Sequence, residues 1–264
     1  MMDNGHDPLT GALGQLTVAP PEDLLARVVA GWVKVPAALG ELYVAFTDRG
    51  ISYVRIAESI GPAADAWSAD EIFCEDYRRR FGRPLRRAER PPAGVLPALR
   101  GRRAGSLRFD LRGLTEFERD VLEATLRIPH GQTRPYAWVA REIGRPRAVR
   151  AVGSALGRNP VPLLIPCHRV TRSDGNPGEY VFGARTKEAL LRAEHVDLDE
   201  VRELAAAGVF FVGSDTTGIA CFPTCHHARR IGAGHRRGFR SMAQAVDAGY
   251  RPCRHCRPVL ADSA

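Results

Sequence analysis

The amino-acid sequence predicts an α+β protein made of three successive parts, and three observations lead to this prediction. Two β-rich runs, 42–46 and 51–56, flank a short turn that contains Gly50, a pattern typical of a β-hairpin. From Leu114 onward, apolar residues recur at helical spacing. Four of the six cysteines then fall beyond position 220, which indicates a separate small unit.

The composition narrows the class of protein. With 264 residues, of which 44% are hydrophobic, the chain suits two or three small folded domains and is too apolar to be disordered. No stretch approaches the roughly 20 apolar residues that span a bilayer. Residues 1–6 do not begin a signal peptide. We therefore expect a soluble, cytoplasmic protein with no membrane partner.

The charge favours a polyanionic partner such as DNA. The formal net charge is +8 and the pI is near 9.6. Apart from Lys34 and Lys187, every Lys or Arg residue is an arginine, whose guanidinium group suits phosphate oxygens. A GC-rich coding sequence would give the same bias, because Ala, Gly and Pro are abundant too. Both explanations stay open on composition alone.

We expect the first segment of the chain to be a lead and the second to be a folded domain. Residues 1–35 are expected to be a lead segment with one helix over Leu24–Val33. Residues 36–112 are expected to form a small α/β domain, in which alternating apolar residues over Leu107–Leu111 add a third strand to the hairpin. The other expected elements are a helix over Asp70–Phe81 and a Pro- and Arg-rich connection over 83–103.

Residues 113–200 are expected to be helical. Thr115 and Glu118 form a capping box at the start of the first helix, which Pro129 ends. Two short helices joined by a turn that contains Gly144 give a helix-turn-helix pattern, which many other helical hairpins share. The later helices are expected over 135–143, 146–157 and 185–194, followed by an acidic, Ala-rich bridge over 197–207.

A cysteine near the end of the Pro-rich apolar run 159–170 is the first candidate for chemistry. Cys167 is followed directly by His168, and a buried thiol needs a base, usually histidine, to become a thiolate. Glu194 is available to hold the imidazole in the required tautomer. Cys167 as nucleophile, His168 as base and Glu194 as the residue that orients the base would then form a catalytic triad. Without such neighbours, a lone cysteine is usually an inert core residue.

The same run carries a family resemblance. Residues 165–170, Ile-Pro-Cys-His-Arg-Val, resemble the active-site signature of the O6-alkylguanine-DNA alkyltransferases. The resemblance extends from about Leu42 to Val196 and includes the segments 128–136, 150–153 and 159–162. It implies a ribonuclease H-like α/β N-terminal domain and a winged-helix-like catalytic domain. It also implies a single-turnover transfer of a methyl group from guanine O6 to the cysteine.

The resemblance gives each matching residue a role. Cys167 accepts the alkyl group, and His168, through a water and oriented by Glu194, removes the thiol proton. Tyr136 assists rotation of the base and supplies a proton to the leaving guanine. Asn159 fixes the active-site segment. Because guanine O6 cannot be reached inside a duplex, the base is flipped, and an arginine finger fills the gap. The expected DNA-contacting residues are Arg150, as that finger, with Ala148, Ala151, Gly153 and Arg169.

The substrate pocket is expected to include Tyr180, Val181 and Phe182. Val181 stands where some family members have a serine near O6, so a backbone N–H would replace that hydrogen bond. Phe182 stands where members that accept large alkyl groups have glycine. The sequence therefore predicts good methyl transfer and poor benzyl transfer.

The last unit, expected over residues 205–260, holds two cysteine pairs. Cys221 and Cys225 are separated by three residues, and Cys253 and Cys256 by two, which is the spacing of a tetrahedral four-thiolate zinc site. We therefore expect one Zn²⁺ and no organic cofactor. Three histidines beside the cysteines are alternative ligands, although four thiolates already complete the set: His226, His227 and His255.

The residues around these cysteines resemble the zinc-binding domain of the Ada methylation-response proteins, over about 208–258. The resemblance implies that Cys221, as a zinc thiolate, accepts a methyl group from a DNA methylphosphotriester. A purely structural zinc site is the alternative, because Phe222 replaces an arginine common in that family and Ala220 an aromatic residue. Eight arginines against three aspartates over 205–264 favour contact with phosphates.

The sequence thus predicts a monomeric methylated-DNA–protein-cysteine methyltransferase that acts on double-stranded DNA bearing alkylated guanine or a methylphosphotriester. In Ada proteins the zinc domain comes first and a regulatory DNA-binding domain follows, whereas here the zinc unit comes last, so transcriptional activation is not expected. The alternative is a DNA-binding methylation sensor or regulator with a structural zinc domain. Cys167 argues against it, since a binding-only relative is expected to lack the nucleophile.

Overall fold

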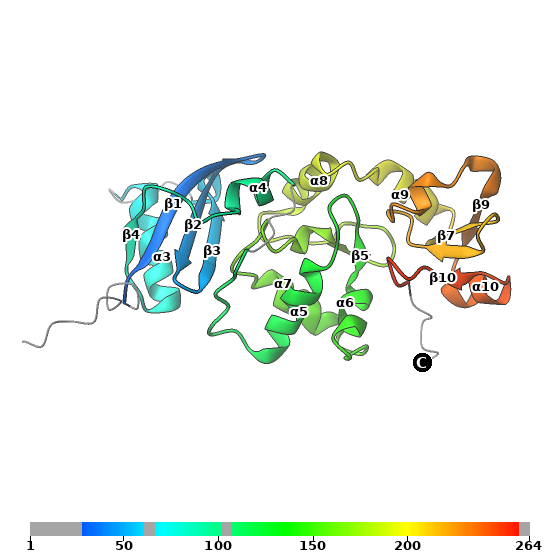
Figure 1. The fold of residues 1–264 in the computed structure, drawn as a ribbon, viewed down its shortest axis with the longest axis horizontal. Helices are drawn as coiled ribbons and strands as arrows, with labels where there is room; N and C mark the ends of the chain where they lie inside the picture. Colours follow the sequence, from blue (N-terminus) through cyan, green and yellow to red (C-terminus); the bar gives the residue numbers. More distant parts are fainter. Residues whose placement is uncertain (1–27, 61–66, 102–106, 259–264) are drawn as a thin grey trace, which may run out of the picture.

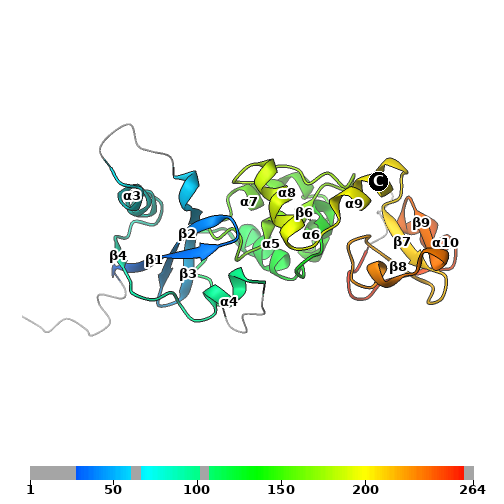
Figure 2. The same cartoon turned by 90° about the horizontal axis from the view of Figure 1, so that it is seen from above.

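The computed structural model describes residues 28–60, 67–101 and 107–258. Figure 1 shows three units in a row: a sheet covered by one long helix, a central group of helices, and a second small sheet. The view from above in Figure 2 shows the same succession, with the central helices between the two sheets. The fold is therefore of the mixed α+β type. Within the described ranges, no helix is both long and apolar enough to cross a membrane.

The first unit is a four-stranded sheet in the order β3-β2-β1-β4. β1, β2 and β3 pair antiparallel as a meander, which includes the expected hairpin, and β4 pairs parallel to β1. Its elements are β1 (Ala30–Ala37), β2 (Gly40–Thr47), β3 (Gly50–Ile56), the 3-10 turn η1 (Ala57–Ser59), α3 (Ala69–Phe81), β4 (Leu85–Arg87) and α4 (Val95–Leu99).

The alternation of side chains along β2 explains why this sheet has two cores. Tyr43 and Ala45 face α3, where Tyr43 stacks on Phe73 with ring centroids 4.6 Å apart. Leu42 and Val44, on the opposite face, join one continuous core with the central helices. The N-terminal sheet is thus a packing partner of the central unit.

Two expectations for this unit were wrong. The helix expected over Leu24–Val33 does not reach Val33: Val28 is helical, but the chain is a strand from Ala30 onward, where β1 pairs with the hairpin. Residues 24–27 lie outside the described part of the chain. The sheet consequently begins before residue 36. Leu107–Leu111 forms a single parallel bridge between Phe109 and Ile51 in place of a strand. The fourth strand is β4, which lies within the Pro- and Arg-rich connection expected over 83–103.

The central unit is helical, as expected. Thr115 and Glu118 form both hydrogen bonds of the capping box at the start of α5. The third helix begins at Val149, later than expected from Pro146, because residues 146 and 147 form a turn. The elements are α5 (Glu116–Leu126), β5 (Arg134–Pro135), α6 (Tyr136–Glu142), α7 (Val149–Gly157), η2 (Cys167–Arg169), β6 (Val170–Thr171) and α8 (Ala184–Ala193).

The third unit is a four-stranded sheet in the order β10-β8-β7-β9. The acidic bridge that precedes it is a helix, α9 (Leu198–Ala206), whose N-cap side chain Asp197 accepts a hydrogen bond from the Glu200 backbone N–H. The other elements are β7 (Phe211–Ser214), β8 (Ile219–Cys221), η3 (Ala228–Arg230), η4 (Ala233–His235), β9 (Arg236–Phe239), α10 (Met242–Asp247) and β10 (Arg251–Pro252).

Candidate active site and metal centre

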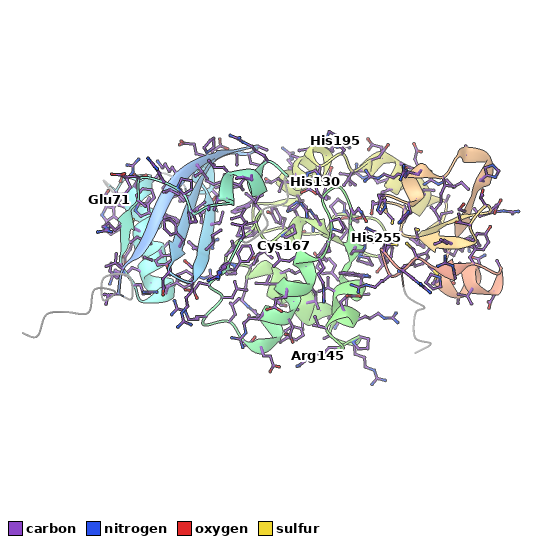
Figure 3. All side chains as sticks on the ribbon, in the orientation of Figure 1. Glu71, His130, Arg145, Cys167, His195 and His255 are labelled. Atoms are coloured by element: carbon purple, nitrogen blue, oxygen red, sulfur yellow. The ribbon has the colours of Figure 1, made fainter. Side chains whose placement is uncertain are left out.

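Cys167 opens a single 3-10 turn at the end of the apolar run and lies in the core, with 4% of its surface exposed. Figure 3 places it in the central unit, near the N-terminal sheet. Its backbone N–H donates to the Ile165 carbonyl at 2.8 Å, and no proline or glycine stands within the turn itself. The thiol is therefore held in one position by its own segment.

Asn159 fixes this segment from the end of α7. Its side-chain Nδ2 donates to the Ile165 carbonyl at 3.0 Å and to Cys167 Sγ at 3.2 Å. Its Oδ1 accepts from the Val161 backbone N–H at 2.9 Å. One buried amide thus ties the start of the run to the sulfur at its end.

His168 and Glu194 meet as the sequence suggested. His168 Nε2 lies 2.8 Å from Glu194 Oε1, and both side chains are buried. Burial lowers the pKa of His168 and outweighs the opposite effect of the carboxylate. His168 Nδ1 is buried and has no hydrogen-bond partner among the described residues. This nitrogen is accordingly the free proton-accepting position of the imidazole.

The Glu194 carboxylate accepts hydrogen bonds from two residues besides His168, which the sequence did not predict. Arg169 clasps the carboxylate through Nε and Nη2, at 2.8 Å each to the nearer oxygen, and also donates to the Ile128 carbonyl. The Gly131 backbone N–H donates to Glu194 Oε2 at 3.0 Å. Burial alone would raise the pKa of Glu194, but the hydrogen bonds from His168 and Arg169 hold it well below its usual range.

The expected contact of Arg169 with DNA stays a prediction, and the structure gives this residue a partner within the protein. Its side chain is only 14% exposed and its guanidinium is occupied by Glu194 and a backbone carbonyl. The cause is local: Arg169 shares a turn with His168, so both side chains reach the same carboxylate.

The thiol of Cys167 is not ionised by its surroundings alone. Burial raises its pKa, and the hydrogen bond from Asn159 and the positive charge of Lys187 offset this only in part. A proton acceptor is therefore needed to produce the thiolate.

Lys187 is a site residue that sequence reasoning missed. It is buried on α8, where Nζ donates to the carbonyls of Val170 at 2.7 Å and Glu179 at 3.2 Å. Burial lowers its pKa to about 8. The sequence held one hint of its importance: Lys187 is one of only two lysines in an arginine-rich chain.

The aromatic residues expected around the reacting base lie against the same core. Tyr136 and Tyr180 pack on the cluster that contains Cys167, and burial raises the pKa of both phenols. Phe182 meets Tyr180 edge to face, with ring centroids 5.5 Å apart. Val181 points outward and is 39% exposed. The described contacts thus join Tyr180 and Phe182, but not Val181, to the buried part of the site.

The residues expected to meet DNA gather at the start of α7. Ala148 is its N-cap, Arg150 and Ala151 are exposed in its first turn, and Gly153 is half-buried. A Cβ added to Gly153 would lie 3.8 Å from the Tyr136 ring, so this helix passes close to the active-site phenol. The exposed face of α7 and the reacting residues therefore belong to one region.

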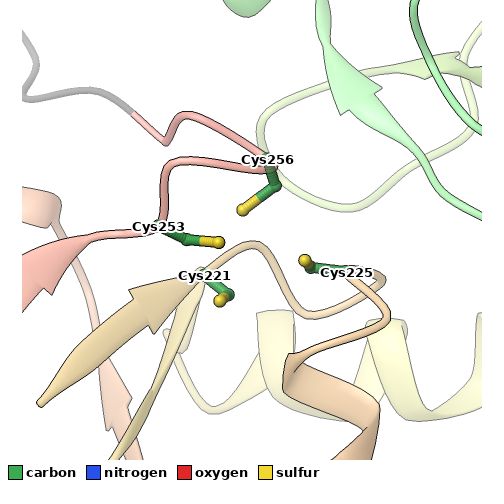
Figure 4. Close-up of side chains that lie close together, drawn as sticks. All are labelled: Cys221, Cys225, Cys253 and Cys256. Carbon is green, nitrogen blue, oxygen red and sulfur yellow. The ribbon is translucent and has the colours of Figure 1, made fainter. Parts of the chain in front are cut away.

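The four expected zinc ligands come together. All four cysteines are buried, and their sulfur atoms lie within 4.8 Å of one another. Figure 4 shows them between the loop after β8 and the turn after β10. Without the metal, hydrogen bonds from the Cys221 and Cys256 thiols lower the pKa of Cys225 and raise that of Cys256, so the four sulfurs are coupled to one another. Four buried sulfurs from two turns fit a tetrahedral Zn²⁺, with Zn–S of about 2.3 Å.

This zinc unit is packed against the central helices. The Thr133 backbone N–H donates to Thr224 Oγ1 at 3.0 Å, and Trp138 Nε1 donates to the Cys256 carbonyl at 3.0 Å. Thr224 precedes one zinc cysteine and Cys256 is another, so both contacts hold the cysteine loops directly.

Arg134 lies in this interface and was also missed by sequence reasoning. It is 1% exposed, its Nη2 donates to Gln132 Oε1 at 2.7 Å, and its guanidinium lies 5.4 Å from the Phe222 ring centroid. Burial lowers its pKa, against which the negative charges of the four cysteines act. Arg134 is thus the buried cation that faces the thiolate cluster.

Comparison with known proteins agrees with both sites. Residues 116–196 match the family model of the 6-O-methylguanine DNA methyltransferase DNA-binding domain, and residues 200–259 match the metal-binding domain of Ada. A methylated-DNA–protein-cysteine methyltransferase of Methanosarcina acetivorans is 33% identical over 161 residues, which cover 59% of this chain and 92% of that protein. This chain belongs to the methylated-DNA–protein-cysteine methyltransferases.

Two further curated proteins and a solved structure are also similar to this chain. The bifunctional transcriptional activator/DNA repair enzyme Ada of Escherichia coli is 35% identical over 59% of this chain and 43% of that protein. A Methanosarcina barkeri methyltransferase is 49% identical over 32% of this chain, so the chain spans about half, 53%, of that relative. The structure of Mycobacterium tuberculosis OGT in complex with DNA is 28% identical, with a TM-score of 0.49, over 65% of this chain and 98% of that one.

Proposed function

We propose that this protein repairs alkylated DNA by direct reversal, transferring a methyl group from guanine O6 to Cys167 once per molecule. The observation that carries the proposal is the buried relay in which Asn159 holds the Cys167 sulfur and Glu194 holds His168. The family match over residues 116–196 covers this whole relay and supports the reading as a methyltransferase. The alternative of a binding-only sensor is not favoured, because the buried nucleophile and its base are both present.

Methyl transfer from guanine O6 to Cys167 needs no cofactor, because the protein's own side chains supply and accept the protons. A water bridges Cys167 Sγ and His168 Nδ1, which has no protein partner among the described residues. The thiol proton passes to His168, the sulfur attacks the methyl carbon, and the carbon–O6 bond breaks. Glu194 stabilises the charged imidazole, and Arg169 and Gly131 keep Glu194 in place.

Tyr136 and Arg150 are proposed to handle the flipped base. The raised pKa of Tyr136 keeps its phenol protonated, so it is able to give a proton to the departing guanine. That proton is restored from the imidazolium through solvent, which leaves neutral guanine and a thioether. Arg150, exposed on α7 beside Ala148, Ala151 and Gly153, enters the stack that the base has left.

A second acceptor, Cys221, is proposed in the zinc unit. Bound Zn²⁺ would keep the Cys221 sulfur deprotonated and nucleophilic. The sulfur would take a methyl group from a neutral DNA phosphotriester, and the phosphodiester would leave as an anion. Arg237 and Arg240 of this unit are exposed, and in this proposal they contact the flanking phosphates.

The finer structural assignments are proposals of the same kind. They are a ribonuclease H-like fold for the N-terminal unit, which begins with β1 and not at residue 36 and runs to 112, a winged-helix-like fold for 113–200, and a zinc domain over 205–260. We also propose that the protein acts as a monomer in the cytoplasm, on double-stranded DNA. The Tyr180 and Phe182 contacts support a narrow pocket for the methyl group, with Val181 at its rim.

The test is intact mass and peptide mapping after incubation with two duplexes. One carries only O6-methylguanine and the other only methylphosphotriesters. We expect one methyl group on the Cys167 peptide from the first duplex and one on the Cys221 peptide from the second. Cys167→Ser and Cys221→Ser variants are the matched controls, each losing one transfer and keeping the other.

The outcomes separate the proposals. Methylation at Cys167 alone would leave the zinc unit as a structural or DNA-holding module. No adduct at either cysteine, in protein that still binds DNA, would contradict the methyltransferase assignment and favour the sensor.

A further inference from the structure

We propose that His226, His227 and His255 form a second metal site, separate from the four cysteines, for a divalent cation of the Zn²⁺, Co²⁺, Ni²⁺ or Cu²⁺ type. Their ligand nitrogens lie within 4.8 Å of one another. The ring centroids of His226 are 3.9 Å from those of His227 and 4.4 Å from those of His255. Three imidazoles this close are able to share one cation after small rotations of their side chains, since Zn–N bonds are about 2.0–2.1 Å long.

The four-cysteine centre positions this histidine cluster. His226 and His227 directly follow Cys225, and His255 lies between Cys253 and Cys256. The first turn is closed by the Arg229 N–H to Cys225 carbonyl bond at 3.1 Å, and the second by the Arg257 N–H to Cys253 carbonyl bond at 2.9 Å. Two loops fixed by one centre therefore hold the three rings beside one another, so that rotation of the side chains alone would bring their nitrogens to one cation.

The surroundings leave the imidazoles free to coordinate. Among the described residues, the three rings contact one another, and no hydrogen bond ties their nitrogens elsewhere. His227 and His255 are exposed and His226 is half-buried, so a cation is able to reach them from solvent. Figure 3 shows His255 between the central helices and the zinc unit. The adjacent four thiolates also offset the charge of an incoming cation.

The ligand type selects the class of metal. Neutral imidazole suits Zn²⁺, Cu²⁺, Ni²⁺ and Co²⁺, whereas Mg²⁺ and Ca²⁺ prefer oxygen ligands, and none of the three residues supplies an oxygen. Three protein ligands leave a fourth position open to water or to an anionic oxygen. The histidine cluster thus offers three protein ligands and leaves one coordination position open, whereas the four cysteines supply all four ligands of their site.

The experiment uses the full-length protein loaded with one Zn²⁺ and freed of weakly held metal with a mild chelator. Co²⁺ is then titrated in and followed by absorption and by metal analysis of the desalted protein. We expect a second metal equivalent whose cobalt bands lack thiolate-to-metal charge transfer, because its ligands are nitrogens. The triple variant His226→Ala/His227→Ala/His255→Ala should keep its Zn²⁺, which shows that it is folded, and lose the second equivalent.

Single variants and a matched histidine sharpen the result. His255→Ala should weaken Co²⁺ binding by at least about tenfold. Loss of a residue that only hydrogen-bonds to a metal ligand already costs about tenfold in metal affinity, and His255 is proposed as a ligand itself. His235→Ala, an exposed histidine of the same unit outside the cluster, should leave binding unchanged. The proposal is overturned if the wild type takes up only one metal, or if the triple variant retains the second. None of these readouts depends on methyl transfer.

Discussion

The indole Nε1 of Trp138 donates a hydrogen bond to the backbone carbonyl of Cys256, 3.0 Å away. A side chain of α6 therefore holds the loop that carries two of the zinc cysteines. Trp138 is 3% exposed, so the carbonyl has no ready access to water in its place.

Replacing this donor tests the strength of the interface. Trp138→Phe keeps an aromatic ring but leaves the buried carbonyl unpaired, which should lower the free energy of unfolding by about 1–3 kcal/mol. Chemical denaturation of zinc-loaded protein measures the change. Trp67→Phe is the control, because Trp67 is 52% exposed. Equal effects of the two substitutions would show that the hydrogen bond contributes nothing.

Two glycines with the same backbone angle separate strain from steric contact. Gly131 and Gly144 both have φ of 70°, so alanine strains either position by about 1–2 kcal/mol. At Gly131 the new Cβ would also lie 2.7 Å from the Glu194 carbonyl oxygen, whereas at Gly144 it meets nothing within 4 Å. Gly131→Ala should therefore destabilise the protein more and slow methyl transfer. Matching losses in both variants, measured by denaturation and single-turnover rate, would refute this.

Glu194→Gln should reduce both stability and rate at neutral pH. The pKa of Glu194 is held below its usual range, so its contribution is present above about pH 4.3, the ordinary carboxyl value, and is lost as pH falls through the lower folded value. Breaking the buried pair with Arg169 should cost about 3 kcal/mol.

The pH dependence supplies the check on this carboxylate. The difference in unfolding free energy between wild type and Glu194→Gln should shrink as the solution is acidified. Glu188→Gln, which breaks a half-exposed pair with Arg202, should have little effect at any pH. A difference for Glu194→Gln that stays constant into strong acid would contradict the assigned protonation state.

Lys187 predicts a pH effect of the same direction in the alkaline range. Its pKa is lowered to about 8 from 10.5, so between these values the unfolded chain binds more protons and stability rises with pH. Lys187→Met should flatten this rise, as measured by denaturation midpoints across the window. Lys34→Met should not, because a hydrogen bond to Asp70 raises the pKa of Lys34 to about 12. An unchanged slope in the Lys187 variant would place its titration elsewhere.

Phe182 should set the size of the alkyl group accepted. We expect Phe182→Ala to react faster with free O6-benzylguanine while methyl transfer from DNA changes little, because the edge-to-face pair with Tyr180 is opened. Val181→Ala is the control, as Val181 points outward. Loss of Cys167 thiol against time gives both rates, and rapid inactivation of the wild type by benzylguanine would sink the idea.

Features with a local cause were predictable from the sequence. The hairpin around Gly50 and the capping box of Thr115 and Glu118 depend on residues a few positions apart, and both are present. The cysteine pairs are equally local, because two short spacings fix two ligands each. The short strand β4 was missed because its three residues are held by pairing with the distant β1.

Functional side chains were harder to predict where burial decides their role. Arg169 was expected at the DNA surface, since arginine suits phosphate, yet its neighbour His168 brings it to Glu194. Lys187 and Arg134 carry no motif, and their importance comes from surrounding elements that remove them from water. Such roles depend on tertiary packing, which spacing in the sequence does not encode.

The burial of Arg134 makes the zinc centre a shared component of two units. Its positive charge is enclosed and faces the cysteine cluster, with Gln132 and a backbone carbonyl as its hydrogen-bond partners. If the metal were withdrawn and the thiols took up protons, this enclosed cation would lose its counter-charge. The resulting loss of stability would affect the loop that leads to Tyr136, in the methyl-transfer half of the protein. Scarcity of zinc would thus be felt by guanine repair, although no metal takes part in that reaction as proposed.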